Sequence, residues 1–166
     1  MKNLTLLVLI VFLLSNCSKK TSTPTPEKPS SKITVKKNDI PWVSEGVYSS
    51  YNVDEDLVYV MSGQENESFQ ISFKKGSIPF DGIMKDFSAG ITIAPFKGSA
   101  TISDSYSLDT TKPNKLKILI IENPEKRIAA DFVLYLKRNG QDTGSEKINV
   151  FQGRFDVRYE PFSLSE

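Results

Sequence analysis

The chain has 166 residues, with 21 basic and 20 acidic side chains, one cysteine and no histidine. Near-zero net charge argues against general nucleic-acid binding, which needs a basic face to neutralise phosphates. The lack of histidine excludes Ser-His and Cys-His pairs and imidazole-bound zinc, and one cysteine gives no intramolecular disulfide. We therefore expect no cofactor, and the length suits one folded domain with a leader.

Residues 1–16 have the composition of a secretory signal peptide. Lys2 precedes an apolar run from Leu4 to Leu14 that only Thr5 interrupts. This run is too short to cross a bilayer, which needs roughly 20 residues, so it fits the hydrophobic region of a cleaved leader.

The end of the leader, Leu14-Ser15-Asn16-Cys17, resembles a bacterial lipoprotein signal. Such signals have an aliphatic residue three positions before the cysteine and a small residue two before it; Asn16 departs from the Gly, Ala or Ser that usually precedes the cysteine. The resemblance implies that Cys17 is acylated and begins the mature protein, because several acyl chains together hold a protein stably at a membrane. The alternative is an incidental thiol after an ordinary signal or in an uncleaved anchor.

Residues 17–32 are predicted to form a disordered tether. Lys, Ser, Thr and Pro prevail, and a segment without apolar side chains other than proline cannot bury enough surface to fold. The acidic run that would resemble the surface-export signal of Bacteroidota lipoproteins is missing after Cys17. This favours the periplasmic face of the outer membrane over the cell surface.

Residues 33–166 are predicted to form a single all-β domain, an antiparallel β-sandwich or a partly closed barrel. Hydrophobic residues repeat with period two in short segments separated by Gly, Pro, Asn and Asp. In "SFQISF", for example, Phe69, Ile71 and Phe73 share one face. The segments are 33–35, 41–43, 46–51, 57–61, 68–73, 91–94, 100–108, 115–121, 130–137 and 150–162.

The last segment, "VFQGRFDVRYEPF", has one apolar and one charged face. Upstream residues have the opposite parity, so we expect a bulge or bend near Val150, with Gly153 allowing close backbone approach. The charged face is interpreted as solvated and paired across strands, with a carboxylate- or glycan-binding stripe as the alternative. The apolar face carries Phe151, Phe155, Val157 and Tyr159.

An opening "ITVKKNDIPWV" and a closing "GRFDVRY" after a lipoprotein leader resemble small Bacteroidota lipoproteins that consist of a domain of unknown function. The resemblance implies an all-β fold and a location in the cell envelope. It implies no functional residue, because this family has no assigned activity.

Asn52, Asp54 and Asp56 have the spacing of the first oxygen ligands of a calcium loop. The sixth position of such a loop would be Leu57 instead of Gly, and the twelfth would be Gly63 instead of Glu. An acidic hairpin tip explains the run equally well.

The ligand candidates are apolar. In the irregular segment 75–97, the spacing of Phe80, Ile83, Met84 and Phe87 predicts one face of a short helical turn, which would form a lid over a ligand cavity or a plug for the core. Trp42, the only tryptophan, is expected to anchor the core or to stack on a sugar. The candidates for ligand contact are thus Phe80, Ile83, Phe87 and Trp42.

Two further features concern modification and catalysis. Asp109-Thr110-Thr111 resembles the O-glycosylation acceptor of Bacteroidota, which makes Thr110 a candidate acceptor. A glycosidase needs only two carboxylates, and Glu122 and Asp131 are the acids we expect to be partly buried, although edge positions or salt bridges with lysines would explain both.

The sequence therefore favours a lipid-anchored binding or accessory module for an envelope protein or a glycan, and no enzyme. The first alternative is a barrel that carries a small apolar ligand beneath residues 78–87. The second is a hydrolase that uses Asp or Glu.

Overall fold

A computed structural model describes residues 30–139 and 148–164. The predicted leader, Cys17 and most of the tether lie outside these residues. None of the helices in the described ranges has the length and apolar character needed to span a membrane. The elements are β1 (Lys32–Lys37), β2 (Ile40–Trp42), β3 (Gly46–Asn52), β4 (Leu57–Gln64), β5 (Glu67–Lys74), η1 (Lys75–Ser77), β6 (Ser88–Ile93), β7 (Asp104–Leu108), β8 (Lys115–Glu122), β9 (Arg127–Arg138), β10 (Asn149–Arg158) and β11 (Glu160–Phe162).

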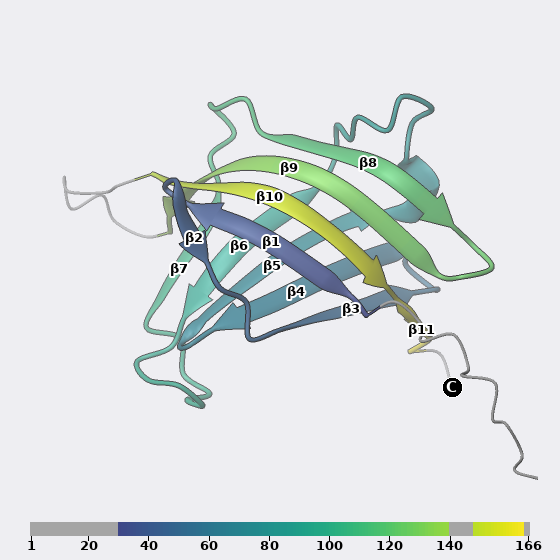
Figure 1. Cartoon of the computed structure of the whole chain (residues 1–166). Coiled ribbons are helices and arrows are strands. Elements are labelled where there is room, and N and C mark those ends of the chain that lie inside the picture. Colours follow the sequence, from purple (N-terminus) through teal and green to yellow (C-terminus); the bar gives the residue numbers. More distant parts are fainter. Residues whose placement is uncertain (1–29, 140–147, 165–166) are drawn as a thin grey trace, which may run out of the picture.

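The described strands form one eleven-stranded sheet in the order β11-β3-β4-β5-β6-β7-β9-β10-β1-β2, with β8 also paired to β9 (Figure 1). β9 has β10 along one edge, and its other edge is shared between β8 and the shorter β7. Neighbouring strands are antiparallel except β11 and β3, and the sheet does not close. The all-β prediction is confirmed; the architecture is one large, mainly antiparallel sheet.

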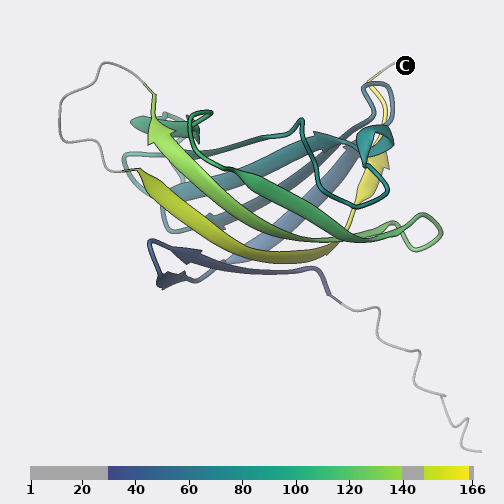
Figure 2. The same cartoon turned by 90° about the horizontal axis from the view of Figure 1, so that it is seen from above.

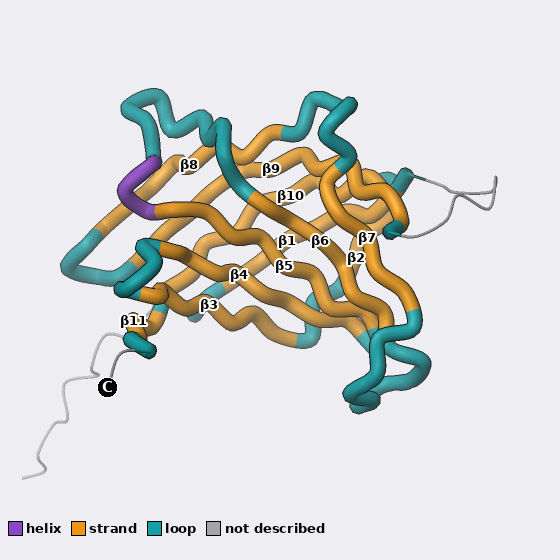
Figure 3. Tube along the Cα trace, turned by 180° about the vertical axis from the view of Figure 1, so that it is seen from behind, coloured by secondary structure: helices purple, strands orange, loops and turns teal. Residues whose placement is uncertain are grey.

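The sheet bends so that its two halves face each other. Strands β3 to β6 lie side by side in one layer (Figure 3), and β9, β10 and β1 curve across them (Figure 2). Side chains from both layers meet between them: the rings of Phe69 on β5 and Phe151 on β10 stack with centroids 5.2 Å apart. Phe69, Ile71 and Phe73 are all buried, which confirms the predicted alternation of β5.

A tight turn at Asn38 and Asp39 connects β1 to β2. Both residues have positive φ, at 52° and 66°, as a two-residue type I′ hairpin requires. Asn and Asp tolerate this conformation better than most residues do, so the sequence "KKND" specifies the turn. The Asn38 side chain also accepts a hydrogen bond from Val150 N at 2.8 Å, which fixes the hairpin against β10.

The register of β10 contradicts one prediction and confirms another. β10 pairs with β9 without interruption from Asn149 to Arg158, so of the bulge or bend expected near Val150 the bulge is wrong. The irregularity lies instead in β8, between Ile118 and Ile120. The expected close approach at Gly153 is confirmed, because a Cβ there would lie 2.0 Å from the carbonyl oxygen of Thr34 on the paired strand β1.

Within the segment 78–87, residues 82–84 run along the outer edge of β8. The predicted helical turn over 80–87 is wrong, and the only helix in the described ranges is η1, which ends at Ser77. Instead, Gly82 O accepts a hydrogen bond from Ile118 N at 2.8 Å, and Met84 N donates to Leu116 O at 2.9 Å. Gly82 has a φ of 72°, and a Cβ there would lie 2.2 Å from Ile118 O, so only glycine fits this edge contact.

Candidate functional site

A hollow of about 370 Å³ lies where the β1–β2 hairpin meets the β4–β5 hairpin. We call it the hairpin cleft. Its volume is within the range of small-molecule sites, which combine an apolar wall with a few placed polar groups. The lining residues are Lys37, Asn38, Ile40, Pro41, Trp42, Gln64, Glu65, Asn66 and Glu67.

Three side chains of the cleft are joined through the carboxylate of Glu67. Trp42 Nε1 donates to Glu67 Oε2 at 3.0 Å, and Lys37 Nζ forms an ion pair with Glu67 Oε1. The Lys37 and Glu67 side chains are only 26% and 20% exposed. Because such a pair is largely withdrawn from water, both partners hold each other in one geometry, and loss of either leaves a poorly solvated charge.

The core supports the cleft from below. The Trp42 ring is buried and makes edge contacts with Phe69 and Phe151, at centroid distances of 6.3 and 6.1 Å. Lys37 Nζ lies 5.8 Å from the centre of the Phe151 ring, within cation–π range. Trp42 therefore anchors the core, which is one of its two predicted roles. Its indole N–H also orients the carboxylate of Glu67 in the cleft.

The sequence contains a signal for this pair, although no motif marks it. Glu67 has the same parity as Phe69 on β5, and Lys37 has the same parity as Val35 on β1. Side chains at alternate positions of a strand point to the same face, so both charges belong to the inward face. Two opposite charges at inward positions predict a pair, but only the fold brings the two strands together.

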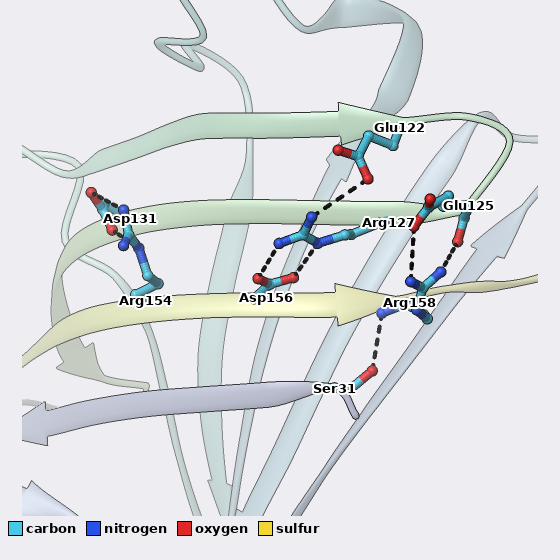
Figure 4. A network of polar contacts seen from close by, with 8 residues as sticks. All are labelled: Ser31, Glu122, Glu125, Arg127, Asp131, Arg154, Asp156 and Arg158. Atoms are coloured by element: carbon cyan, nitrogen blue, oxygen red, sulfur yellow. Dashed lines mark hydrogen bonds and ion pairs between the residues drawn. The ribbon is translucent and has the colours of Figure 1, made fainter. Parts of the chain in front are cut away.

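The outer face of β8, β9 and β10 carries a ladder of ion pairs (Figure 4). Arg127 on β9 lies between Glu122 on β8 and Asp156 on β10. Its Nε and Nη2 donate to the two oxygens of Asp156 at 2.8 and 2.7 Å, and Nη1 lies 3.5 Å from Glu122 Oε2. The hydrogen bonds from Arg127 lower the pKa of Asp156 below its ordinary value.

Arginines and acids alternate along the rest of this face. Arg154 Nε donates to Asp131 Oδ1 at 2.8 Å, and Arg158 Nη2 donates to Glu125 Oε2 at 2.9 Å (Figure 4). Cross-strand pairing of the charged face is therefore confirmed. The buried Nε of Arg158 has no hydrogen-bond partner within the described chain.

Two further hollows lie beside this ladder. The outer groove, about 550 Å³, is lined by Thr34, Val35, Lys36, Asp131, Gln152, Gly153 and Arg154. The Ser30 hollow, about 110 Å³, is lined by Ser30, Ser31, Lys32, Arg127, Asp156, Val157 and Arg158. Both of these hollows and the hairpin cleft border β1, the strand that follows the predicted tether.

The oxygens of the predicted calcium loop are engaged in local hydrogen bonds. Asn52 Oδ1 accepts from the backbone of Asp54 at 3.0 Å, and Asp56 Oδ2 accepts from Gly76 N at 2.7 Å. Asp54 Oδ2 accepts from Leu164 N at 2.8 Å. Across residues 30–139 and 148–164, no three His, Cys, Asp or Glu side chains are grouped to hold a metal. Calcium binding by this loop stays a prediction.

The three apolar ligand candidates of the segment 78–87 do not share one environment. Phe80 and Ile83 are exposed, whereas Phe87 packs against the core, to which the buried Met84 belongs. The segment contributes side chains to the core and backbone hydrogen bonds to β8, as a plug would. A ligand cavity beneath it stays a prediction.

One of the two acids expected to be partly buried, Glu122, is so, whereas the other, Asp131, is not. Asp131 is exposed and Glu122 is partly exposed, and both pair with arginines rather than lysines. Asp109 is instead buried, where its side chain accepts hydrogen bonds from Thr111 N and Oγ1 at 3.0 and 2.7 Å. These bonds lower the pKa of Asp109 and form a turn that leaves Thr110 exposed. Glycosylation of Thr110 stays a prediction.

Comparison of the chain with known protein families, with curated proteins and with solved structures found no match.

Proposed function

We propose that this protein is a lipid-anchored binding or accessory module of a bacterial cell envelope. The lipid on Cys17 would hold it at the outer membrane, on the periplasmic face. Residues 17–32 would supply reach, and the sheet would supply a rigid platform for an envelope protein or a glycan.

One observation carries the binding part of the proposal: β1 borders the hairpin cleft, the outer groove and the Ser30 hollow. β1 begins at Lys32, the last residue of the predicted tether. A rigid scaffold presents recognition groups with little loss of conformational entropy on binding, and β1 is fixed by pairing along its whole length with β10. The hollows around β1 are therefore held in place on a domain that the tether keeps near the membrane.

The anchor is tested by Cys17→Ser in the full chain, expressed in a bacterium that processes lipoproteins. We expect the variant to move from the membrane fraction to the soluble fraction and to lose incorporation of a fatty-acid label. Ser18→Ala, beside the cysteine, is the matched control and should remain at the membrane. Membrane attachment of the Cys17→Ser chain would refute the anchor.

The binding part is tested by a photo-crosslinking residue at Gln152 in the outer groove or at Gln64 in the hairpin cleft. A control crosslinker at Gln70 lies on β5, at a position that lines none of the three hollows. In intact cells, we expect a reproducible adduct from Gln152 or Gln64 and none from Gln70. Equal adducts at all three positions, or none at any, would contradict a binding role for these hollows.

A further inference from the structure

We infer that the hairpin cleft binds a neutral, hydroxyl-rich ligand, that is, a short oligosaccharide or the end of a glycan chain. The inference deepens the proposed function and rests on it for the role of the domain as a binding module. It follows from the polar groups of the cleft, its charge, its apolar wall and the edge of β2.

The acceptors of the cleft match sugar hydroxyls. Each oxygen of Glu67 takes one hydrogen bond, from Trp42 or from Lys37, and a carboxylate offers about four acceptor positions. Two positions therefore remain for hydroxyl donors. Gln64 and Asn66 line the same hollow, and an amide both donates and accepts, as a hydroxyl does, although Asn66 Nδ2 already donates one hydrogen bond to Ala94 O at 2.6 Å.

The charge of the cleft disfavours anionic ligands. Lys37 and Glu67 neutralise each other, and the remaining charged lining residue is Glu65, so the net charge is negative. A phosphate or carboxylate ligand would meet this negative charge and find Lys37 already paired. A cation would have to compete with Lys37 for the carboxylate of Glu67. The other negative charge of the lining, on Glu65, is exposed to water, which weakens its attraction for a cation.

The apolar wall of the cleft and the edge of β2 favour a sugar over a peptide as the ligand. Ile40 and Pro41 are exposed beside Trp42 and offer an apolar surface to the C–H face of a sugar ring. Among the described strands, β2 pairs only with β1, so a peptide strand would have to add at its other edge. Pro41, in the middle of β2, has no N–H to donate to an added strand.

Trp42 gives a direct readout, because it is the only tryptophan of the chain and it lines the cleft. The full chain is purified in a detergent without sugar head groups, and indole emission is followed during titration. The probes are neutral trisaccharides of glucose, mannose, galactose and N-acetylglucosamine, with inorganic phosphate and a proline-rich peptide as the competing classes. We expect a saturable change with at least one trisaccharide, with a Kd below about 10 mM, and none with phosphate or peptide.

Two variants locate the binding. Glu67→Gln keeps an acceptor for Trp42 but removes the negative charge. It should weaken the affinity for the trisaccharide by about tenfold. Gln64→Ala should also weaken it, whereas Gln70→Ala, the matched change outside the cleft, should not. Circular dichroism and the emission of the free variants show that each remains folded.

The inference is overturned if no trisaccharide gives a saturable change, if phosphate or the peptide alone does, or if Glu67→Gln and Gln64→Ala bind as the parent does. These outcomes are separate from the fate of the proposed function. If Cys17→Ser releases the chain from the membrane but the parent chain binds none of the sugars, the lipid anchor stands. Only the ligand proposed for the hairpin cleft is then refuted.

Discussion

Gly153 on β10 lies close beside the backbone of Thr34 on the paired strand β1: a methyl group at position 153 would come within 2.0 Å of the Thr34 carbonyl oxygen and 3.0 Å of Val35 Cα. The contacting atoms are backbone, so a side chain cannot simply rotate away. We therefore predict that Gly153→Ala destabilises the domain by about 1–3 kcal/mol, measured by chemical denaturation, because β1 must shift from β10.

Gly46→Ala on β3 is the matched control for this change. A Cβ at Gly46 meets no atom of the described residues within 4 Å, and its φ does not lie in the left-handed region. Such a substitution is expected to be neutral or to stabilise by up to about 1 kcal/mol, since it restricts the unfolded chain. Equal stability of the two variants would show that β1 does not pack on Gly153 as described.

The second prediction concerns the aromatic centre between the two layers. Phe151 is fully buried, stacks on Phe69 and contacts the edge of Trp42. Phe151→Ala should lower the free energy of unfolding by about 3–5 kcal/mol. Phe80→Ala removes an equally large side chain that is fully exposed, and it should change the stability by no more than about 0.5 kcal/mol. A large loss for Phe80→Ala would mean that this ring is covered in solution.

The strands were predictable because each depends on a local pattern. Alternation in β5 and β10 identifies the inward residues, and the Asn38-Asp39 dipeptide favours the hairpin turn that forms. Gly153 was predictable as a point of close approach because glycine interrupts an otherwise alternating strand. All of these signals lie within a few residues of the feature that they predict.

The remaining features depend on contacts between distant segments. The helical spacing of Phe80 to Phe87 is misleading, because hydrogen bonds to β8 determine the path of this segment. Lys37 and Glu67 meet across two hairpins, and parity alone does not reveal which strands face each other. Alternating apolar residues likewise do not show that β11 is parallel to β3, since either direction satisfies the same pattern.

The third prediction concerns pH. Arg127 lowers the pKa of Asp156, so this carboxylate binds protons more weakly in the folded chain than in the unfolded one. Its contribution is therefore fully present above the ordinary Asp pKa of 3.8 and is lost as the pH falls through the lower, folded pKa. Asp156→Asn should cost up to about 1 kcal/mol at neutral pH, since the pair is partly exposed to solvent.

The same variant should lose less stability than the parent between about pH 5 and pH 2, because it no longer has this proton to take up. Urea denaturation over this range measures the difference. Asp86→Asn, at an exposed position, is the control and should follow the parent. Identical acid profiles for Asp156→Asn and the parent would contradict a stabilising role for the pair.

The last prediction concerns the carboxyl-terminal strand β11, which is held as a separate strap along β3. All three of its residues are exposed, so it gains little from burial. Its attachments are polar: Val53 N donates to Phe162 O at 2.9 Å, and the Asp54 carboxylate accepts from Ser163 Oγ and Leu164 N. Asp54→Ala should release the strap and raise the exchange rate of the Val53 amide by about tenfold, with less than about 1 kcal/mol lost globally.

Native-state hydrogen exchange separates local release from global unfolding. In Asp54→Ala, the Val53 amide should exchange faster while the amide of Ile71, in the centre of β5, keeps its protection. Glu55→Ala removes the neighbouring exposed acid and should change neither rate. If the Val53 amide in Asp54→Ala exchanges at the parental rate, the carboxylate does not hold the strap, and backbone pairing with β3 alone must retain it.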